Sequence, residues 1–373
     1  MRLLMMVVAT TLVVPTSPPT VSALRATTAL LTKRGVSGPS VVLRAFERGG
    51  RSFYLVVDPR TLATRVLPAT NATIDARPWP VIRAVLDDTT YGRALTEAEG
   101  HEGPLQDAGL TSIRAPRPGI DLTVDLCPSR RPLDRSLFNA LVDELGHEQK
   151  PVPVGIAVTG VWMQEHPQDL AWLLSLARAG TLDVTWINHS FHHRSNPSLP
   201  LRSNFLLEPG TDLTLEVLET ERAMLTAGIT PSVFFRFPGL VSTPTVFERI
   251  VALGLIPLGS DAWLAKNEWP REGSIVLVHA NGNEPFKPRL VLRADPGSLS
   301  WTAAGGGAVD LRVAWARYRD YSPRRGIIAV AAAINGARMS VPTPSSVGQS
   351  AARTACENAQ RKALCASIPS RCS

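Results

Sequence analysis

The feature that most limits how this chain can fold is an alternation of strand-like and helix-like segments, which begins at Ile120. Short apolar runs rich in β-branched residues alternate with segments in which apolar residues recur at helical spacing. Such alternation is typical of βαβ units and predicts an α/β fold with a parallel sheet, either open or closed into a barrel. We predict six strands, at Ile120–Leu126, Val152–Thr159, Leu182–Asn188, Ser232–Phe237, Leu255–Ser260 and Ser274–His279.

Four helices are predicted between these strands. Their apolar periods run over Leu133–Leu145, Leu170–Leu176, Leu213–Leu225 and the segment that starts at Thr243-Pro244. Gly228 and Gly254 follow the last two, as is typical of residues that end helices.

We place this α/β segment at residues 119–300, with one region before it and two after it. Residues 24–118 form a β-rich region of unknown role, in which Asp58-Pro59-Arg60 predicts a turn between the strands of a hairpin, Ser52–Val57 and Thr64–Leu67. Gly305-Gly306-Gly307 marks a linker at 301–325. Residues 326–373 form a small segment that holds three of the four cysteines, Cys356, Cys365 and Cys372. Four cysteines allow three pairings, and the sequence does not choose among them.

The N-terminus predicts export from the cytoplasm. Arg2 precedes a predominantly apolar run of 12 residues, Leu3–Val14, which is shorter than the roughly 18 to 20 that a membrane span needs. Val21-Ser22-Ala23 follows a turn-rich stretch, as at the end of a secretory signal peptide. We therefore expect a signal peptide at 1–23, cleavage after Ala23, a secreted or periplasmic protein and no transmembrane span; a buried first helix is the alternative.

The charge of the chain is only modestly basic, with 39 Lys and Arg against 32 Asp and Glu. An excess this small, spread along the sequence, does not indicate a nucleic-acid partner, and it fits an anionic envelope polymer only loosely. The oligomeric state stays open.

Polar residues gather where the predicted strands end. His189 and His193 are four residues apart directly after a strand, and on a helical turn this spacing would let both imidazoles share a divalent metal. The carboxyl ends of parallel strands meet at one edge, and charged residues there are costly unless they contact one another. The sequence therefore predicts a site at this edge. Its other members are Asp125, Arg236, Asp261 and His279.

Five short motifs place these residues in the order of a known family. They are Thr123-Val124-Asp125-Leu126-Cys127-Pro128, His189-Ser190-Phe191-His192-His193, Arg236-Phe237-Pro238, Ser260-Asp261-Ala262-Trp263 and Leu277-Val278-His279. With them, residues 121–285 resemble the polysaccharide deacetylases of carbohydrate esterase family 4. The segment Val152–Pro167 is similar to the family's second strand and loop.

The resemblance implies a distorted (β/α) barrel that removes acetyl groups, most often N-acetyl, from a carbohydrate polymer or oligosaccharide. It implies that His189 and His193 bind a divalent metal, most often zinc, with cobalt as another choice. It also places Trp263, Leu277 and Pro238 against the substrate, with Trp263 and Leu277 as walls of the acetyl pocket.

The same resemblance assigns the catalytic groups. Asp125 would be the general base that takes a proton from water, and Arg236 would pair with it and orient it. His279 would protonate the leaving amine as general acid, with Asp261 tuning its pKa.

One departure from the family concerns the metal. The family's second Asp of the first motif, a metal ligand, is Leu126 here, and the following Gly is Cys127. Three interpretations follow: His189 and His193 bind metal together with Asp125 and water; Cys127 supplies a thiolate; or the site is vacant and the protein is a catalytically silent carbohydrate binder. We favour the first, because the base, the acid, the arginine and both histidines are retained. A metal hydrolase acting on a non-sugar amide or ester differs from the first only in its substrate.

Overall fold

The computed structural model describes residues 20–32, 40–70, 72–113, 120–147 and 149–282, and the backbone of three short strands beyond them. Those strands are β13 (Arg293–Asp295), β14 (Ser298–Thr302) and β15 (Ala308–Leu311), which pair in an antiparallel sheet and overlap the start of the predicted linker. The predicted Cys-containing segment at 326–373 lies outside the described residues. No helix in the described part of the chain is both long enough and apolar enough to cross a membrane.

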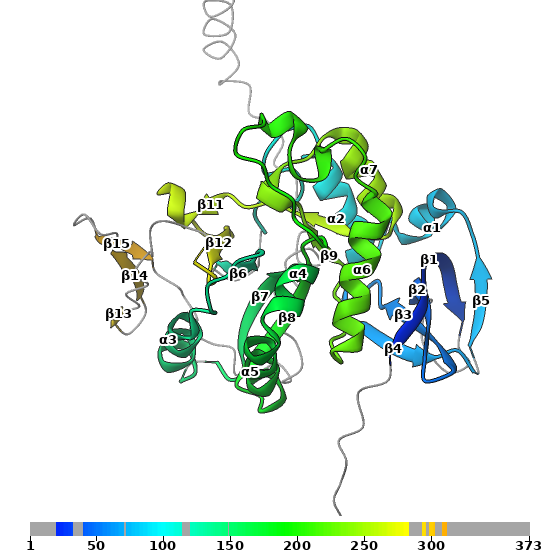
Figure 1. The fold of residues 1–373 in the computed structure, drawn as a ribbon, viewed down its shortest axis with the longest axis horizontal. Coiled ribbons are helices and arrows are strands. Elements are labelled where there is room, and N and C mark those ends of the chain that lie inside the picture. Colours follow the sequence, from blue (N-terminus) through cyan, green and yellow to red (C-terminus); the bar gives the residue numbers. More distant parts are fainter. Residues whose placement is uncertain are drawn as a thin grey trace, which may run out of the picture. The chain divides into compact units, whose positions relative to one another are not determined.

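The largest sheet in the described part of the chain is curled and parallel (Figure 1). Its strand order is β10-β9-β8-β7-β6-β12-β11, and every neighbouring pair is parallel. The six predicted strands and the distorted barrel are confirmed, whereas the two-residue β11 was not predicted. The bounds are β6 (Asp121–Leu126), β7 (Val152–Val158), β8 (Leu182–Asn188), β9 (Phe234–Arg236), β10 (Ile256–Leu258), β11 (Ala262–Trp263) and β12 (Ile275–His279).

The four predicted helices are also present, and side-chain caps begin three of them. Asp134, Asp212 and Thr243 each accept a hydrogen bond from a backbone N–H in the first turn. The bounds are α3 (Arg135–Leu145), α5 (Pro167–Arg178), α6 (Leu213–Thr226) and α7 (Pro244–Ala252), with α4 (Gly160–Glu165) not predicted. The loops of the described residues contain four short 3₁₀ turns: η1 (Leu201–Ser203), η2 (Phe205–Leu207), η3 (Pro238–Leu240) and η4 (Leu264–Lys266).

The segment before the parallel sheet bridges β10 and the start of β12. Leu110 forms a parallel bridge with Leu258 of β10, and Ser112 forms an antiparallel bridge with Ser274, next to β12. The Ile275 N–H also donates to the Thr111 carbonyl at 3.1 Å. Residues N-terminal to the predicted boundary at 119 therefore complete the barrel.

The N-terminal region is an antiparallel sheet followed by two helices that were not predicted. Its strand order is β4-β3-β2-β1-β5, and the β3–β4 pair confirms the predicted hairpin. A cut after Ala23 would fall inside β1, where Val21 is buried and pairs with Arg48. The bounds are β1 (Val21–Thr32), β2 (Ser40–Arg48), β3 (Arg51–Val57), β4 (Thr64–Pro68), β5 (Thr73–Ala76), α1 (Trp79–Leu86) and α2 (Thr90–Glu99).

This N-terminal region shares a core with the barrel. Leu43 and Tyr91 belong to the same buried apolar cluster as Phe247 of α7. Arg44, which is fully buried, forms a two-point ion pair with Glu221 of α6, with 2.9 Å between Nη2 and Oε1. Because a buried charge without its partner is strongly destabilising, this pair fixes the sheet against α6.

Asp121, at the start of β6, predicts a pH-dependent stability. Burial raises the pKa of the Asp121 carboxyl from 3.8 to about 6. A carboxyl whose folded pKa is raised stabilises the fold fully below pH 3.8, and this contribution is lost as pH rises through 6. We expect Asp121→Asn to raise the free energy of unfolding by up to about 3 kcal/mol at pH 8 and to change it little at pH 4, measured by urea denaturation. An equal effect at both pH values would contradict this assignment.

Candidate active site

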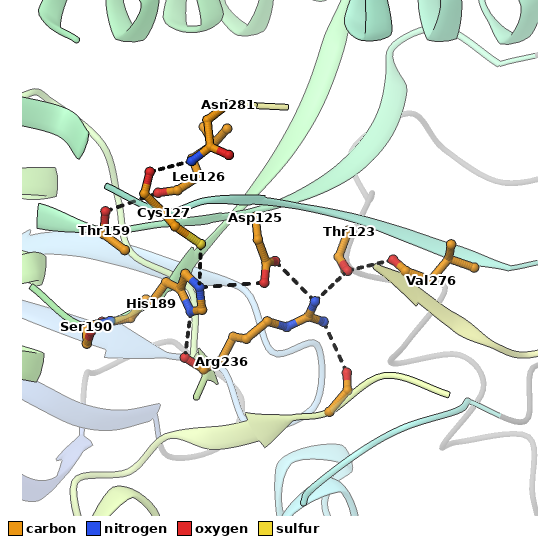
Figure 2. A network of polar contacts seen from close by, with 12 residues as sticks. Thr123, Asp125, Leu126, Cys127, Thr159, His189, Ser190, Arg236, Val276 and Asn281 are labelled. Carbon is orange, nitrogen blue, oxygen red and sulfur yellow. Dashed lines mark hydrogen bonds and ion pairs between the residues drawn. The ribbon is translucent and has the colours of Figure 1, made fainter. Parts of the chain in front are cut away.

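The end of β6 presents two side chains to the candidate site and turns a third away. Side chains alternate along a strand, so Asp125 and Cys127 share one face and Leu126 takes the other. Leu126 is fully buried with Val124 in the apolar cluster that also contains residues of α3, α4 and α5. Asp125 and Cys127 instead face His189 (Figure 2). Leu126 therefore does not occupy a vacated ligand position in the site.

Arg236, at the end of β9, holds the Asp125 carboxylate. It is fully buried, and its Nη1 donates to Asp125 Oδ1 at 3.2 Å and to Thr123 Oγ1 at 2.9 Å. Its Nη2 donates to the Gly259 carbonyl at 3.1 Å. The guanidinium thus orients one carboxylate oxygen and leaves the other, Oδ2, directed toward His189, 3.6 Å from its Nε2.

His189 follows β8 and is itself fixed by a backbone contact. Its Nδ1 lies 2.9 Å from the Arg236 carbonyl, so we assign the ring proton to Nδ1, which donates to that oxygen. Burial lowers the pKa of His189, which keeps the imidazole neutral. Its unprotonated Nε2 then faces Asp125 and, at 3.5 Å, the Cys127 sulfur. A histidine that donates one N–H to a carbonyl and exposes the other nitrogen is typical of metal ligands.

The predicted helical turn that would carry His189 and His193 is wrong. The segment is an irregular loop in which Ser190 and His193 have φ angles of +66° and +47°. The loop nevertheless brings the two rings to 4.8 Å between centroids. Cys127 joins them: the sulfur and one nitrogen from each ring all lie within 4.8 Å of one another, in the part of the chain that the structure describes.

The loop is shaped by Glu216, a residue that the sequence interpretation missed. Glu216 lies on the buried face of α6, and its Oε2 accepts hydrogen bonds from the backbone N–H groups of Phe191 and His192, both at 2.9 Å. Its Oε1 lies 2.7 Å from His192 Nδ1. His192, which lies between the two predicted ligands, therefore contacts Glu216. A carboxylate next to the apolar Val217 on a buried helix face is the signal that would have found it.

We expect Glu216→Ala to weaken metal binding by about 10- to 100-fold, because residues that orient metal ligands typically contribute this much. Competition with a chromogenic chelator measures the affinity. Glu219→Ala is the matched control, since Glu219 lies on the same helix and pairs with Arg222. Unchanged affinity in a folded Glu216→Ala protein would contradict a positioning role.

The electrostatics favour ionisation of Cys127. Burial opposes ionisation of its thiol, but the neighbouring His193 and His279 lower its pKa from 9.0 to about 6. His279 ends β12, where the strand register pairs it with Asp125. The base and the acid expected from the motifs thus lie on adjacent strands.

The remaining predicted site residues are three that would contact substrate and Asp261. Trp263 packs against His279 with 5.8 Å between ring centroids, and Leu277 is buried on the same face of β12 as His279. Pro238 is buried at the start of η3. Asp261, expected to tune His279, forms an ion pair with Arg271 at 3.4 Å.

Comparison with solved structures returns proteins of carbohydrate esterase family 4, whereas no family model matches the chain. A CE4 family pseudoenzyme from Bacillus anthracis is 13% identical, with 48% of this chain and 60% of that chain covered and a TM-score of 0.34. A family 4 carbohydrate esterase from Streptomyces lividans, in complex with acetate, is 19% identical (45% and 82% covered, TM-score 0.33). A family 4 carbohydrate esterase from Bacillus anthracis is 20% identical (50% and 77% covered, TM-score 0.35).

These similarities are too low to transfer an activity, so any function has to come from the residues of this chain. The curled parallel sheet and the five motifs in order define a fold of the carbohydrate esterase family 4 type.

The donor atoms of the site fit a divalent metal. The unprotonated His189 Nε2 faces a carboxylate oxygen and a sulfur at 3.6 and 3.5 Å, and electron-rich atoms that converge in a buried place need a cation or a shared proton between them. Imidazole and thiolate together suit zinc or cobalt better than magnesium or calcium.

Proposed function

We propose that this protein is a metal-dependent hydrolase that removes acetyl groups, most often N-acetyl, from a carbohydrate. The observation that carries this proposal is the position of Asp125, held on one oxygen by Arg236 and directed with the other toward His189. A carboxyl group oriented beside a pair of histidines suits general-base catalysis of hydrolysis.

His189 and His193 would hold the metal, which when bound supplies Lewis-acid polarisation of the acetyl carbonyl. Asp125 accepts a proton from the attacking water at Oδ2, because Oδ1 is engaged by Arg236. His279, on the neighbouring strand, donates a proton to the leaving nitrogen. Leu277 and Trp263, both next to His279, wall the space for the acetyl methyl group.

A secreted or periplasmic location suits this activity, since acetylated envelope polymers are found there. We retain the signal peptide as part of the proposal. A cleavage point before Val21 would leave β1 whole, whereas one after Ala23 would remove three of its residues.

A catalytically silent carbohydrate-binding protein is the second candidate. The observation in its favour is Leu126, which places no carboxylate ligand in the site. The two candidates predict different products from the same incubation.

The experiment is a screen for acetate release by zinc-loaded protein. The substrates are peptidoglycan fragments, chitin-like oligomers, poly-N-acetylglucosamine and an O-acetylated polysaccharide, with acetylated non-sugar amides and esters beside them. We expect acetate from at least one of the carbohydrates. Binding to a glycan without acetate from any substrate would establish the silent binder, and release from the non-sugar compounds alone would redirect the substrate class.

A further inference from the structure

We propose that Cys127 is the third protein ligand of the metal, which gives a Cys-His-His site in which Asp125 stays free for proton transfer. The inference rests on the proposed function, because it assigns the donor set of the same site. It departs from the interpretation favoured by the sequence, in which Asp125 completed the metal site.

The first argument is that the distances between the Cys127 sulfur and the histidine nitrogens suit a zinc site. Zinc binds sulfur at about 2.3 Å and imidazole nitrogen at about 2.0 to 2.1 Å, so two ligand atoms of a tetrahedral site lie about 3.5 Å apart. Cys127 Sγ lies 3.5 Å from His189 Nε2. The His193 nitrogen lies within 4.8 Å of both atoms, so a small side-chain movement of this partly buried residue completes the triangle.

The second argument is that two side chains fix the backbone at Cys127 by hydrogen bonds. Asn281, just after β12, donates from its Nδ2 to the Cys127 carbonyl. Thr159, after β7, donates from its Oγ1 to the Leu126 carbonyl at 3.1 Å. Both side chains are buried, and Figure 2 shows their contacts with the backbone of Leu126 and Cys127. A ligand whose backbone is held in this way keeps its position whether or not a metal is bound.

The third argument is that Asp125 and Cys127 have different contacts. Asp125 Oδ1 is engaged by the buried Arg236, which would otherwise lack a charged partner among the described residues that contact it. Cys127, two residues further along the chain, also points toward His189, but its side chain is not paired with Arg236. A thiolate there supplies the single negative charge that a carboxylate ligand would supply, while it favours zinc or cobalt over harder cations.

Cobalt substitution tests the ligand directly, because a thiolate bound to Co²⁺ produces a sulfur-to-metal charge-transfer band in the near ultraviolet. We expect the band in the wild-type full-length protein and in Asp125→Asn, and its loss in Cys127→Ser. We also expect Cys127→Ser to bind zinc at least about 10-fold more weakly in a chelator competition. Cys127→Asp should recover zinc affinity without the band. Thermal melts of the metal-free variants show whether each is folded.

Failure of this inference is distinguishable from failure of the proposed function. Cobalt bound without the band, together with acetate release, would overturn the Cys127 assignment alone. The band without acetate release from any substrate would support Cys127 as a ligand and overturn the hydrolase. Absence of any bound metal in the folded wild-type protein would overturn both.

Discussion

Replacement of Asp125 by Asn should lower the rate of acetate release by about 10²-fold or more and leave the metal content nearly unchanged. Asparagine keeps the shape of the side chain but cannot accept the proton of the attacking water. In the Cys-His-His arrangement Asp125 is not a ligand, so the metal should stay. Initial rates on the best carbohydrate and metal analysis of the same preparation give the two values.

A matched control separates catalysis from packing, because Asp125 also neutralises the buried Arg236. Removal of one member of a buried ion pair typically costs about 3 to 5 kcal/mol, so thermal melts must accompany the rates. Thr123→Val removes another hydrogen bond to Arg236 and no catalytic group. Near-wild-type rates in Asp125→Asn, or an equal loss in Thr123→Val, would remove Asp125 from the mechanism.

Replacement of His189 by Ala should reduce bound zinc from about one ion per chain to near zero and acetate release to background, because a zinc site needs about three protein ligands to hold its metal. Mass spectrometry of the metals in purified protein measures the first effect. His189 is buried and donates to Arg236, so its loss also disturbs the fold locally. His193→Ala, at a less buried position, provides the second test.

The control for these variants is His101→Ala, since His101 is exposed and outside the site. It should retain metal and activity. Full metal content in both His189→Ala and His193→Ala would show that the two histidines are not ligands.

The alternation of strands and helices along the barrel could be predicted from the sequence because each of those strands and helices has its own local pattern. Asp125, Arg236 and His279 stand at strand ends, and parallel pairing brings them to one edge without further information. The shape of the His189–His193 loop could not be predicted, because it depends on Glu216, a carboxylate far along the chain. The Arg44–Glu221 pair is long-range in the same way.

Cys127 is a different case, because the sequence did contain the necessary signal. A comparison of motifs letter by letter placed the missing ligand at Leu126. Strand alternation instead puts residues 125 and 127 on one face and residue 126 on the other. The structure agrees with the alternation: Leu126 is in the apolar cluster and Cys127 is beside His189.

Titration of zinc into metal-free protein tests whether this protein is a working metal-dependent deacetylase. The protein is stripped with a chelator and dialysed, and acetate release from the best carbohydrate is followed as zinc is added. We expect no release at the start, a rise in proportion to zinc, saturation near one equivalent per chain, and almost no recovery in Asp125→Asn. Release that is insensitive to chelation, or glycan binding with no release at any zinc concentration, would contradict this expectation.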